Sequence, residues 1–177
     1  MALIVLPDPS LVVLIGAAGA GKSTLAARLF EPAEIVSSDA LRALISGDEA
    51  DQRVSGVAFR ILHRTVGRRL AARQLTVVDA TNTEPAVRRP LVARADAAGI
   101  PVTAIVLDID PATVKRQNTG RSRVVSDEVI ERHLAAVRRT VDADVLAVEG
   151  FDQVIVLRTP YDALALTMER GPTLRRR

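Results

Sequence analysis

Short runs rich in Val, Ile and Leu alternate along the chain with longer stretches of helical character. Five such runs lie at residues 11–15, 34–37, 75–80, 102–109 and 151–158. Short runs of this kind are typical of strands, and a fully apolar run is typical of a strand buried on both faces. Helical spacing or helix caps are found between them, at residues 22–30, 39–45, 53–73, 83–99, 111–117 and 126–141.

This alternation predicts a doubly wound α/β fold, with five parallel strands and helices on both faces of the sheet. Thr83 and Ser126 are the predicted caps of the helices that follow them. We expect one domain over residues 1–160, opening on an extended lead-in with Pro7 and Pro9. Residues 161–177 are expected to form a helix and linker tail, with the linker in "ERGPTLRRR".

The segment "GAAGAGKS", Gly16 to Ser23, matches the phosphate-loop pattern G-x-x-x-x-G-K-S and lies between a strand and a helix. Its glycines let backbone N–H groups face phosphate oxygens, and the helix N-terminus adds positive potential. Lys22 is expected to bridge the β and γ phosphates of a nucleotide, and Ser23 to bind Mg²⁺. The predicted nucleotide-binding segment consists of Gly16, Ala17, Ala18, Gly19, Ala20, Gly21, Lys22, Ser23 and Thr24.

Three classes of protein share such a loop: GTPase switches, ATP-driven motors and small kinases. The base-reading Asn-Lys-x-Asp motif of a GTPase is missing, because Lys occurs only at positions 22 and 115. At 177 residues, the chain is also shorter than expected of a motor with oligomer-forming elements. A small kinase needs an acid after the second strand and a basic lid over the phosphates.

The segment "SSDALR" supplies the acid. Asp39 directly follows the second predicted strand, so it is expected at the same sheet edge as the phosphate loop. A carboxylate there can accept the proton of an acceptor hydroxyl, although an acid at this place can also cap a helix. Arg42 lies three residues later, on the same helix face, and can hold a phosphate beside that hydroxyl.

The segment "RQNTGRSR" supplies the lid, in a Gly-containing break between two helices. Arg116, Arg121 and Arg123 can neutralise charge on the transferred phosphoryl group, or can belong to an ordinary solvated loop.

Two further residues follow the third predicted strand, in "VVDATN". Asp79 is expected to hold Mg²⁺ directly or through water. Asn82 is expected either to touch the acceptor or to cap the next helix.

Composition narrows the possible partners. The chain has no Cys, so disulfides and thiolate metal sites are excluded, and its two His residues lack metal-ligand spacing. A net charge of +3 and an aromatic content of 2% do not favour a general nucleic-acid binder with a base-stacking platform. Neither a signal peptide nor a membrane span is indicated, so we expect a soluble, cytoplasmic protein.

Taken together, these motifs resemble the 5′-OH polynucleotide kinase family. The similarity is greatest to the N-terminal kinase module of the bacterial polynucleotide kinase–phosphatase–ligase, which heals and seals RNA ends. The similar segments include "LVVLIGAAGAGKSTLAARLF", "SSDALRALISGDEADQ" and "VVDATN", and they spread over residues 11–158.

The resemblance implies a P-loop kinase fold with an Arg-bearing lid, ATP as phosphate donor, Mg²⁺ as cofactor, and the 5′-OH end of RNA or DNA as acceptor. Lys22 and Ser23 would serve ATP and Mg²⁺, and Asp39 would be the general base. Arg42 would grip the acceptor's 3′ phosphate. Arg121, with Arg123 nearby, would bind the ATP phosphates.

The family lid reads Arg-Asn-x-x-Arg, whereas Gln117 precedes Asn118 here, so the role of Arg116 is open. The roles of Asp51 and Gln52, which match the family pattern, are open too. The phosphatase and ligase modules of the longer family enzyme lie outside these 177 residues. An excised domain and a free-standing relative are both compatible with this, as are a monomer and a homo-oligomer.

Two alternatives remain. One is a small-molecule kinase with the same core, acting on a sugar, nucleoside or antibiotic hydroxyl; Arg42 argues against it. The other is a non-catalytic ATP-binding regulatory module, which would not need Lys22, Ser23 and Asp39 together.

Overall fold

The computed structural model describes residues 3–120, 124–142 and 145–172 of the chain. Its first half contains β1 (Leu3–Asp8), β2 (Leu11–Gly16), α1 (Lys22–Leu29), η1 (Pro32–Glu34), β3 (Ile35–Ser37), α2 (Ser38–Ser46), η2 (Gln52–Val54), α3 (Ser55–Ala71) and β4 (Thr76–Asp79). Its second half contains α4 (Pro85–Ala97), β5 (Val102–Leu107), α5 (Pro111–Thr119), α6 (Asp127–Asp142), α7 (Val145–Val148), β6 (Gln153–Leu157), α8 (Pro160–Ala165) and β7 (Thr167–Pro172).

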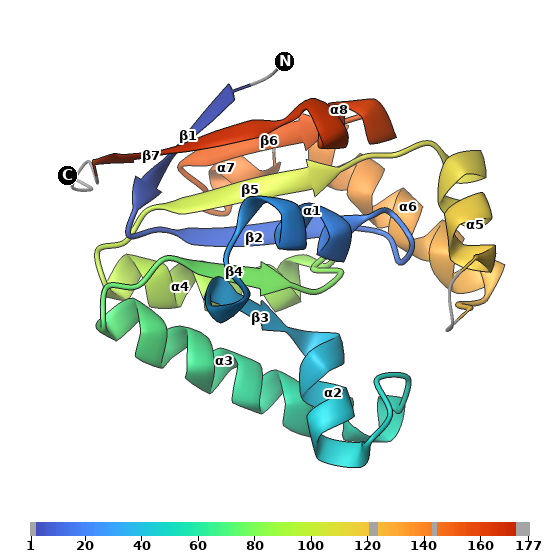
Figure 1. Ribbon diagram of the computed structural model, residues 1–177, viewed down its shortest axis with the longest axis horizontal. Helices are drawn as coiled ribbons and strands as arrows, with labels where there is room; N and C mark the ends of the chain where they lie inside the picture. Colours follow the sequence, from blue (N-terminus) through green and yellow to red (C-terminus); the bar gives the residue numbers. More distant parts are fainter. Residues whose placement is uncertain (1–2, 121–123, 143–144, 173–177) are drawn as a thin grey trace.

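The central sheet has five parallel strands in the order β3-β4-β2-β5-β6, which confirms the predicted number and direction of strands (Figure 1). From β2 the chain crosses to the edge strand β3, reverses, and runs back through β4 and past β2 to β5 and β6, so β2 lies between β4 and β5. This is the switch point at which α/β folds bind ligands. The phosphate loop follows β2 and therefore lies at that point.

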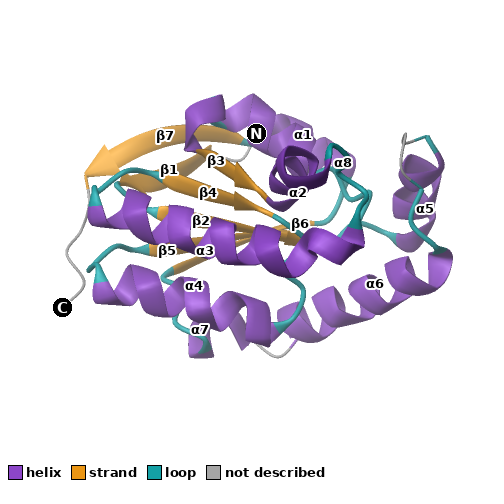
Figure 2. Ribbon diagram, turned by 90° about the horizontal axis from the view of Figure 1, so that it is seen from below, coloured by secondary structure: helices purple, strands orange, loops and turns teal. Residues whose placement is uncertain are grey.

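Every residue of β2 is buried, because the strand has helices on both sides. Val12 and Leu14 point into one core, with side chains from α1 and from β1. Leu11, Val13 and Ile15 point into the other core, with α3 and α4. Figure 2 shows α3 and α4 side by side across the sheet face on that second side. The prediction of helices on both faces is confirmed.

The two ends of the chain form a small sheet that the sequence analysis missed. Strand β1 pairs in parallel with β7, with Leu3 opposite Thr167 and Asp8 opposite Pro172. Arg170 adds ion pairs to Asp8 and Glu34. The expected lead-in is thus a strand, and the expected linker is wrong for Glu169–Pro172. The reason is burial, since Ile4 and Leu6 of β1 contribute to the core.

Helix boundaries agree with the predictions to within a few residues, with two corrections. Helix α4 has Glu84, not Thr83, at its N-cap position. The helix predicted over 53–73 is divided into η2 and α3, because the Asp51 side chain accepts a hydrogen bond from the Arg53 N–H and starts a separate turn. None of the described helices is long and apolar enough to cross a bilayer.

A buried ion pair supports the loop between β4 and α4. The guanidinium of Arg88, which is fully buried, donates to the carboxylate of Glu149 at 2.7 and 2.8 Å. It also donates to the carbonyls of Asn82 and Thr83. Because the loop carbonyls and the carboxylate together satisfy the guanidinium, this charge is tolerated inside the protein.

Glu149→Ala should lower the free energy of unfolding by about 3–5 kcal/mol, because it leaves Arg88 buried without its counter-ion. Chemical denaturation followed by circular dichroism measures this change. Glu131→Ala, which breaks the exposed ion pair with Lys115, is the matched control and should have a much smaller effect. Equal losses for the two variants would contradict the importance of the buried pair.

Candidate active site

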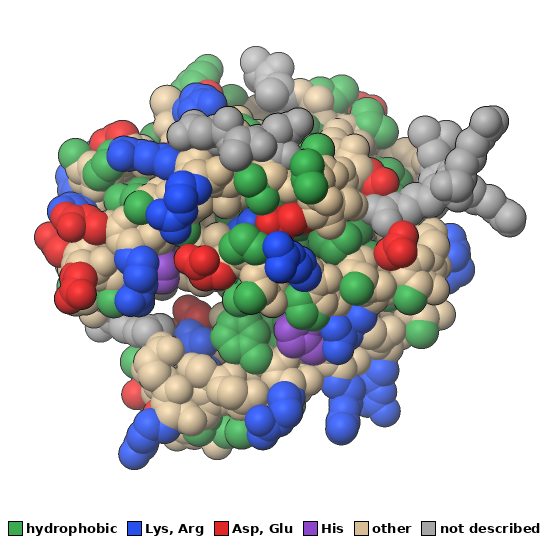
Figure 3. All heavy atoms as spheres, turned by 180° about the vertical axis from the view of Figure 1, so that it is seen from behind, with side chains coloured by type: hydrophobic (Ala, Val, Ile, Leu, Met, Phe, Trp, Pro, Cys, Tyr) green, Lys and Arg blue, Asp and Glu red, His purple; other side chains and the backbone are tan. Residues whose placement is uncertain are grey.

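A cleft of about 820 Å³ opens at the carboxyl ends of the central strands. The phosphate loop, from Ala18 to Thr24, lines its middle. One side of the cleft is made by α1, α5 and α8, and the other by α2, α3 and α6. Figure 3 shows a hollow on the back of the molecule with acidic and basic side chains inside it. The cleft therefore has room for two substrates on either side of one phosphate-binding loop.

Lys22 begins α1, and the residue is only 8% exposed. Its ammonium donates to the carbonyls of Gly16 at 2.9 Å and Ala17 at 2.7 Å. These bonds hold the positive charge over the loop, where phosphate groups of a nucleotide would lie. The structure thus places Lys22 where the motif predicted it.

Gly19 is the loop position that most clearly requires glycine. Its φ is +86°, which is unfavourable for other residues. A Cβ at this position would also lie 3.1 Å from the Val114 carbonyl oxygen and 3.3 Å from Asn118 Cβ. The loop therefore packs closely against α5, the helix that precedes the predicted lid.

Ser23 and Asp79, the two predicted magnesium ligands, lie in direct contact. The Ser23 hydroxyl donates to the Asp79 carboxylate at 2.7 Å, although the two residues lie 56 positions apart in the sequence. Mg²⁺ in nucleotide sites uses few protein ligands and takes its other oxygens from phosphates and water. A hydroxyl and a carboxylate beside a phosphate loop fit this ligand set. The described residues contain no cluster of three or more His, Cys, Asp or Glu for a metal held by the protein alone.

Asp39 and Arg42 lie together on the other side of the cleft, in the first turns of α2. The Arg42 Nη2 donates to Asp39 Oδ1, and its Nε donates to the Glu49 carbonyl at 2.7 Å. The Arg42 side chain is 6% exposed, whereas that of Asp39 is 37% exposed. Arg42 is therefore held in place by its neighbours, and the carboxylate beside it can be reached from the cleft. Asp39 does not cap α2, because the cap is the Ser37 hydroxyl.

Asn82 has a different role from either of those predicted. It is 2% exposed and does not line the cleft. Its amide donates to the Leu14 carbonyl at 2.8 Å and to the Ala80 carbonyl at 3.3 Å. Because the amide nitrogen donates to backbone carbonyls and the residue is buried away from the cleft, Asn82 joins the β4–α4 loop to β2, and it neither touches an acceptor nor caps α4.

The lid is described only in part. Arg121 and Arg123 lie outside the described residues. Arg116 is exposed, bonds to Thr113 on its own helix and does not line the cleft, whereas Gln117 does.

The amide of buried Asn118 also belongs to this region. It donates to the Val125 carbonyl at 2.8 Å and accepts from the Val125 N–H at 3.0 Å. These two bonds hold the ends of the lid segment together next to the phosphate loop.

Asp51 and Gln52 have separate roles. Asp51 caps the short turn η2 and forms an ion pair with Arg53. These contacts lower the pKa of the Asp51 carboxyl group. Gln52 lines the cleft.

Several cleft residues were missed by sequence reasoning. On the α1 side these are Arg28, Val125 and a short apolar group from α8, namely Pro160, Ala163 and Leu164. On the α2 side they are Phe59 of α3 and Val129, Arg132 and His133 of α6. The capping box of Thr159 and Asp162 was a visible signal for α8. No comparable signal marks the others, which belong to ordinary amphipathic helices.

His133 is part-buried, and its environment favours the neutral imidazole. Burial lowers its pKa, the charges of Lys22 and Arg132 lower it further, and Glu84 opposes them weakly. His63, which is also part-buried, has its pKa lowered by burial and by Arg94.

A family model described as an AAA domain matches residues 11–143, which is more than half of the chain. The chain belongs to the AAA domain family. The matched region contains the phosphate loop, Asp39, Arg42 and Asp79. No match was found among curated proteins.

Solved structures show that this AAA domain has a P-loop kinase-like fold. A chain of the Pnkp1/Rnl/Hen1 RNA repair complex is similar with a TM-score of 0.66 and 19% identity, over 78% of this chain and 47% of that chain. This chain therefore spans about half the length of that relative.

Two small kinases are similar over most of their length. A gluconokinase from Sinorhizobium meliloti 1021 has a TM-score of 0.56 and 16% identity, with 90% of this chain and 92% of that chain covered. The APS kinase CysC of Mycobacterium tuberculosis, solved with AMPPNP and APS, has a TM-score of 0.52 and 17% identity, with 88% and 90% covered. At these identities the likeness shows the fold alone.

The two His residues predict how the stability of the fold changes with pH. Their folded-state pKa values lie below the unfolded value of about 6.5, so the unfolded chain binds more protons just below that pH. The thermal midpoint should therefore fall between about pH 7.5 and pH 5.5, and it should fall less in His63→Gln/His133→Gln. Equal slopes for the wild type and the variant would contradict this assignment.

Proposed function

We propose that this AAA domain transfers the γ-phosphate of ATP, with Mg²⁺, to the 5′-OH end of RNA or DNA. The observation that carries the proposal is the pair formed by Asp39 and Arg42 on the side of the cleft opposite α1 and α8. An accessible carboxylate suits a hydroxyl that must lose a proton. A guanidinium held beside it suits a phosphate close to that hydroxyl, as in a polynucleotide end.

The donor side is assigned to ATP. Lys22 and the N-terminus of α1 hold the β and γ phosphates, and the apolar side chains of α8 lie where the base would be bound. Ser23 and Asp79 would hold Mg²⁺, which when bound lowers the charge of the phosphates. We assign Arg121, with Arg123 nearby, to the same phosphates as lid residues.

The transfer step requires the 5′ oxygen, the γ-phosphorus and the β–γ bridging oxygen to lie in line. Asp39 accepts the proton of the 5′-OH, whose oxygen forms a new bond to the γ-phosphorus. The bond from that phosphorus to the β–γ bridging oxygen breaks, and ADP leaves. Lys22, which lies over the phosphate loop, stabilises the negative charge that moves onto the leaving group.

The RNA repair complex among the similar structures favours a nucleic-acid acceptor. The same proposal places this domain in a longer parent protein with phosphatase and ligase modules. That protein would work on nucleic-acid repair in the cytoplasm. A small-molecule kinase is the second candidate, and the gluconokinase likeness over 92% of that chain favours it. The two candidates differ in what Arg42 binds, because a plain sugar has no phosphate beside the accepting hydroxyl.

Transfer of label from γ-labelled ATP to 5′-OH oligonucleotides, and not to 5′-phosphorylated ones, tests the proposal directly. Asp39→Asn should reduce kcat by about 10²–10⁴-fold, the usual contribution of a general base. It should leave ATP affinity near that of the wild type, because Asp39 lies on the acceptor side. A comparable loss of ATP affinity would show that Asp39 is not the base.

Arg42→Ala should raise the KM for acceptors with a phosphate 3′ to the terminal nucleoside by about 10–100-fold, the range for a lost hydrogen bond to a charged group. A nucleoside without that phosphate is the matched substrate, and its phosphorylation should change little. If both acceptors lose activity equally, Arg42 does not bind the phosphate, and the small-molecule candidate gains support.

A further inference from the structure

One face of α3 has a row of basic residues that the proposed transfer does not use. Arg60, Arg64 and Arg68 are all exposed and follow one another at intervals of four residues. Such a spacing places them on one side of the helix, about 6 Å apart along its axis. We call these three residues the α3 basic row.

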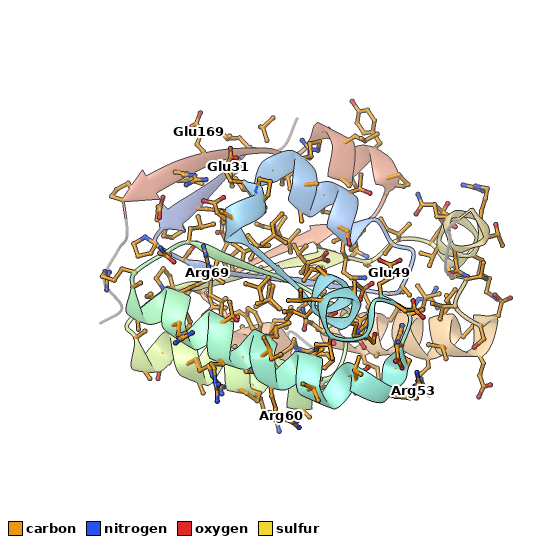
Figure 4. All side chains as sticks on the ribbon, turned by 60° about the horizontal axis from the view of Figure 1, so that its bottom comes forward. Glu31, Glu49, Arg53, Arg60, Arg69 and Glu169 are labelled. Carbon is orange, nitrogen blue, oxygen red and sulfur yellow. The ribbon has the colours of Figure 1, made fainter. Side chains whose placement is uncertain are left out.

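The charge of the row is not balanced locally. No Asp or Glu occurs between residues 52 and 78 of the sequence. Among the described residues, none forms a hydrogen bond or an ion pair with the side chain of Arg60, Arg64 or Arg68. Arg53 and Arg69 differ, because Arg53 pairs with Asp51 and Arg69 donates to Leu75 and Thr76. Figure 4 shows Arg60 pointing outward from α3, and Figure 3 shows basic side chains along the lower edge of the molecule.

The row begins beside the acceptor side of the cleft. Gln52 and Phe59, at the start of this helical segment, both line the cleft. Arg60 is the next residue after Phe59, and Arg64 and Arg68 lie progressively farther from the cleft along α3. Val57 and Ile61, which are apolar and exposed, lie among the basic residues. The surface therefore offers phosphate contacts and apolar contacts in one continuous line from the cleft.

We propose that the α3 basic row binds the phosphates of a single-stranded polynucleotide whose 5′ end lies in the cleft. This inference rests on the proposed function, and it adds an interaction surface for the nucleotides beyond the terminal one. Phosphate contacts with Arg explain binding without base specificity. Phe59, in the cleft, is the one Phe, Tyr or Trp next to this path among the described residues, and the ring of His63 on α3 is part-buried, so extensive base stacking is not expected.

The test measures binding of a 5′-OH single strand of about 12 nucleotides, a length within the range of single-strand sites, by fluorescence anisotropy at several salt concentrations. In Arg64→Gln/Arg68→Gln, the slope of log K against log salt should become shallower by about 1.4, because each phosphate neutralised on a single strand contributes about 0.7. Arg138→Gln/Arg139→Gln removes the same charge from exposed positions of α6 and should keep the wild-type slope. Arg64→Lys/Arg68→Lys should also keep it.

Kinase assays separate this inference from the proposed function. Arg64→Gln/Arg68→Gln should raise the KM of the long strand and leave that of a nucleoside 3′-monophosphate unchanged. Equal salt slopes in the wild type and in this variant would overturn the inference while leaving 5′-OH transfer intact. If the wild type labels no 5′-OH acceptor, the proposed function fails, and the anisotropy data alone decide whether the row binds a strand. Polyglutamate is the competing ligand. If the wild type binds polyglutamate more tightly than the strand, and Arg64→Gln/Arg68→Gln loses that binding, the row binds an acidic protein and the proposal is overturned.

Discussion

Two hydrogen bonds join the end of β2, where the phosphate loop begins, to the loop that follows β4, and the rest of the site depends on them. The Gly16 N–H donates to the Thr81 carbonyl at 3.0 Å, and the Asn82 amide donates to the Leu14 carbonyl at 2.8 Å. Buried backbone groups that lose such partners cost about 1–3 kcal/mol each, so these contacts strongly favour one relative position of β2 and β4. Asp79 ends β4, and Ser23 follows the phosphate loop in the first turn of α1, so fixing β2 beside β4 favours their 2.7 Å contact.

Behind these bonds lies a buried charge. The buried guanidinium of Arg88 donates to the carbonyls of Asn82 and Thr83. The carboxylate of Glu149, the residue directly after α7, neutralises its charge. The phosphate loop is thus held in place by packing at Gly19, and the loop after β4 by the polar contacts of Arg88. A phosphoryl-transfer site gains from this rigidity, because most of its catalytic power comes from placing charges before the reaction. The proposed acceptor side is built in the same way, since Arg42 donates both to the Glu49 carbonyl and to the Asp39 carboxylate.

Much of the fold was predictable from the sequence because its signals are local. The runs of Val, Ile and Leu and the glycine-rich loop each depend on neighbouring residues, and they led to the five parallel strands and the phosphate loop. Asp39 could be placed at the sheet edge because it directly follows a strand. The ends of the chain could not be predicted in this way, since β1 and β7 are stabilised by pairing across nearly the full length of the sequence.

The sequence by itself determined which groups are the candidates for binding phosphate, Mg²⁺ and a hydroxyl proton, because these candidate roles depend on residue type and on position relative to one strand or helix. Only the tertiary structure decided which other residues lie beside these groups in the cleft. It brought Phe59, Arg132 and His133 to the cleft from two helices, turned Asn82 into a backbone tie, and moved Arg116 away from the cleft. Glu149 lies 61 positions from Arg88 in the sequence, and no local pattern links the two. Contacts of this kind arise from the order of the strands in the sheet, which brings distant segments side by side.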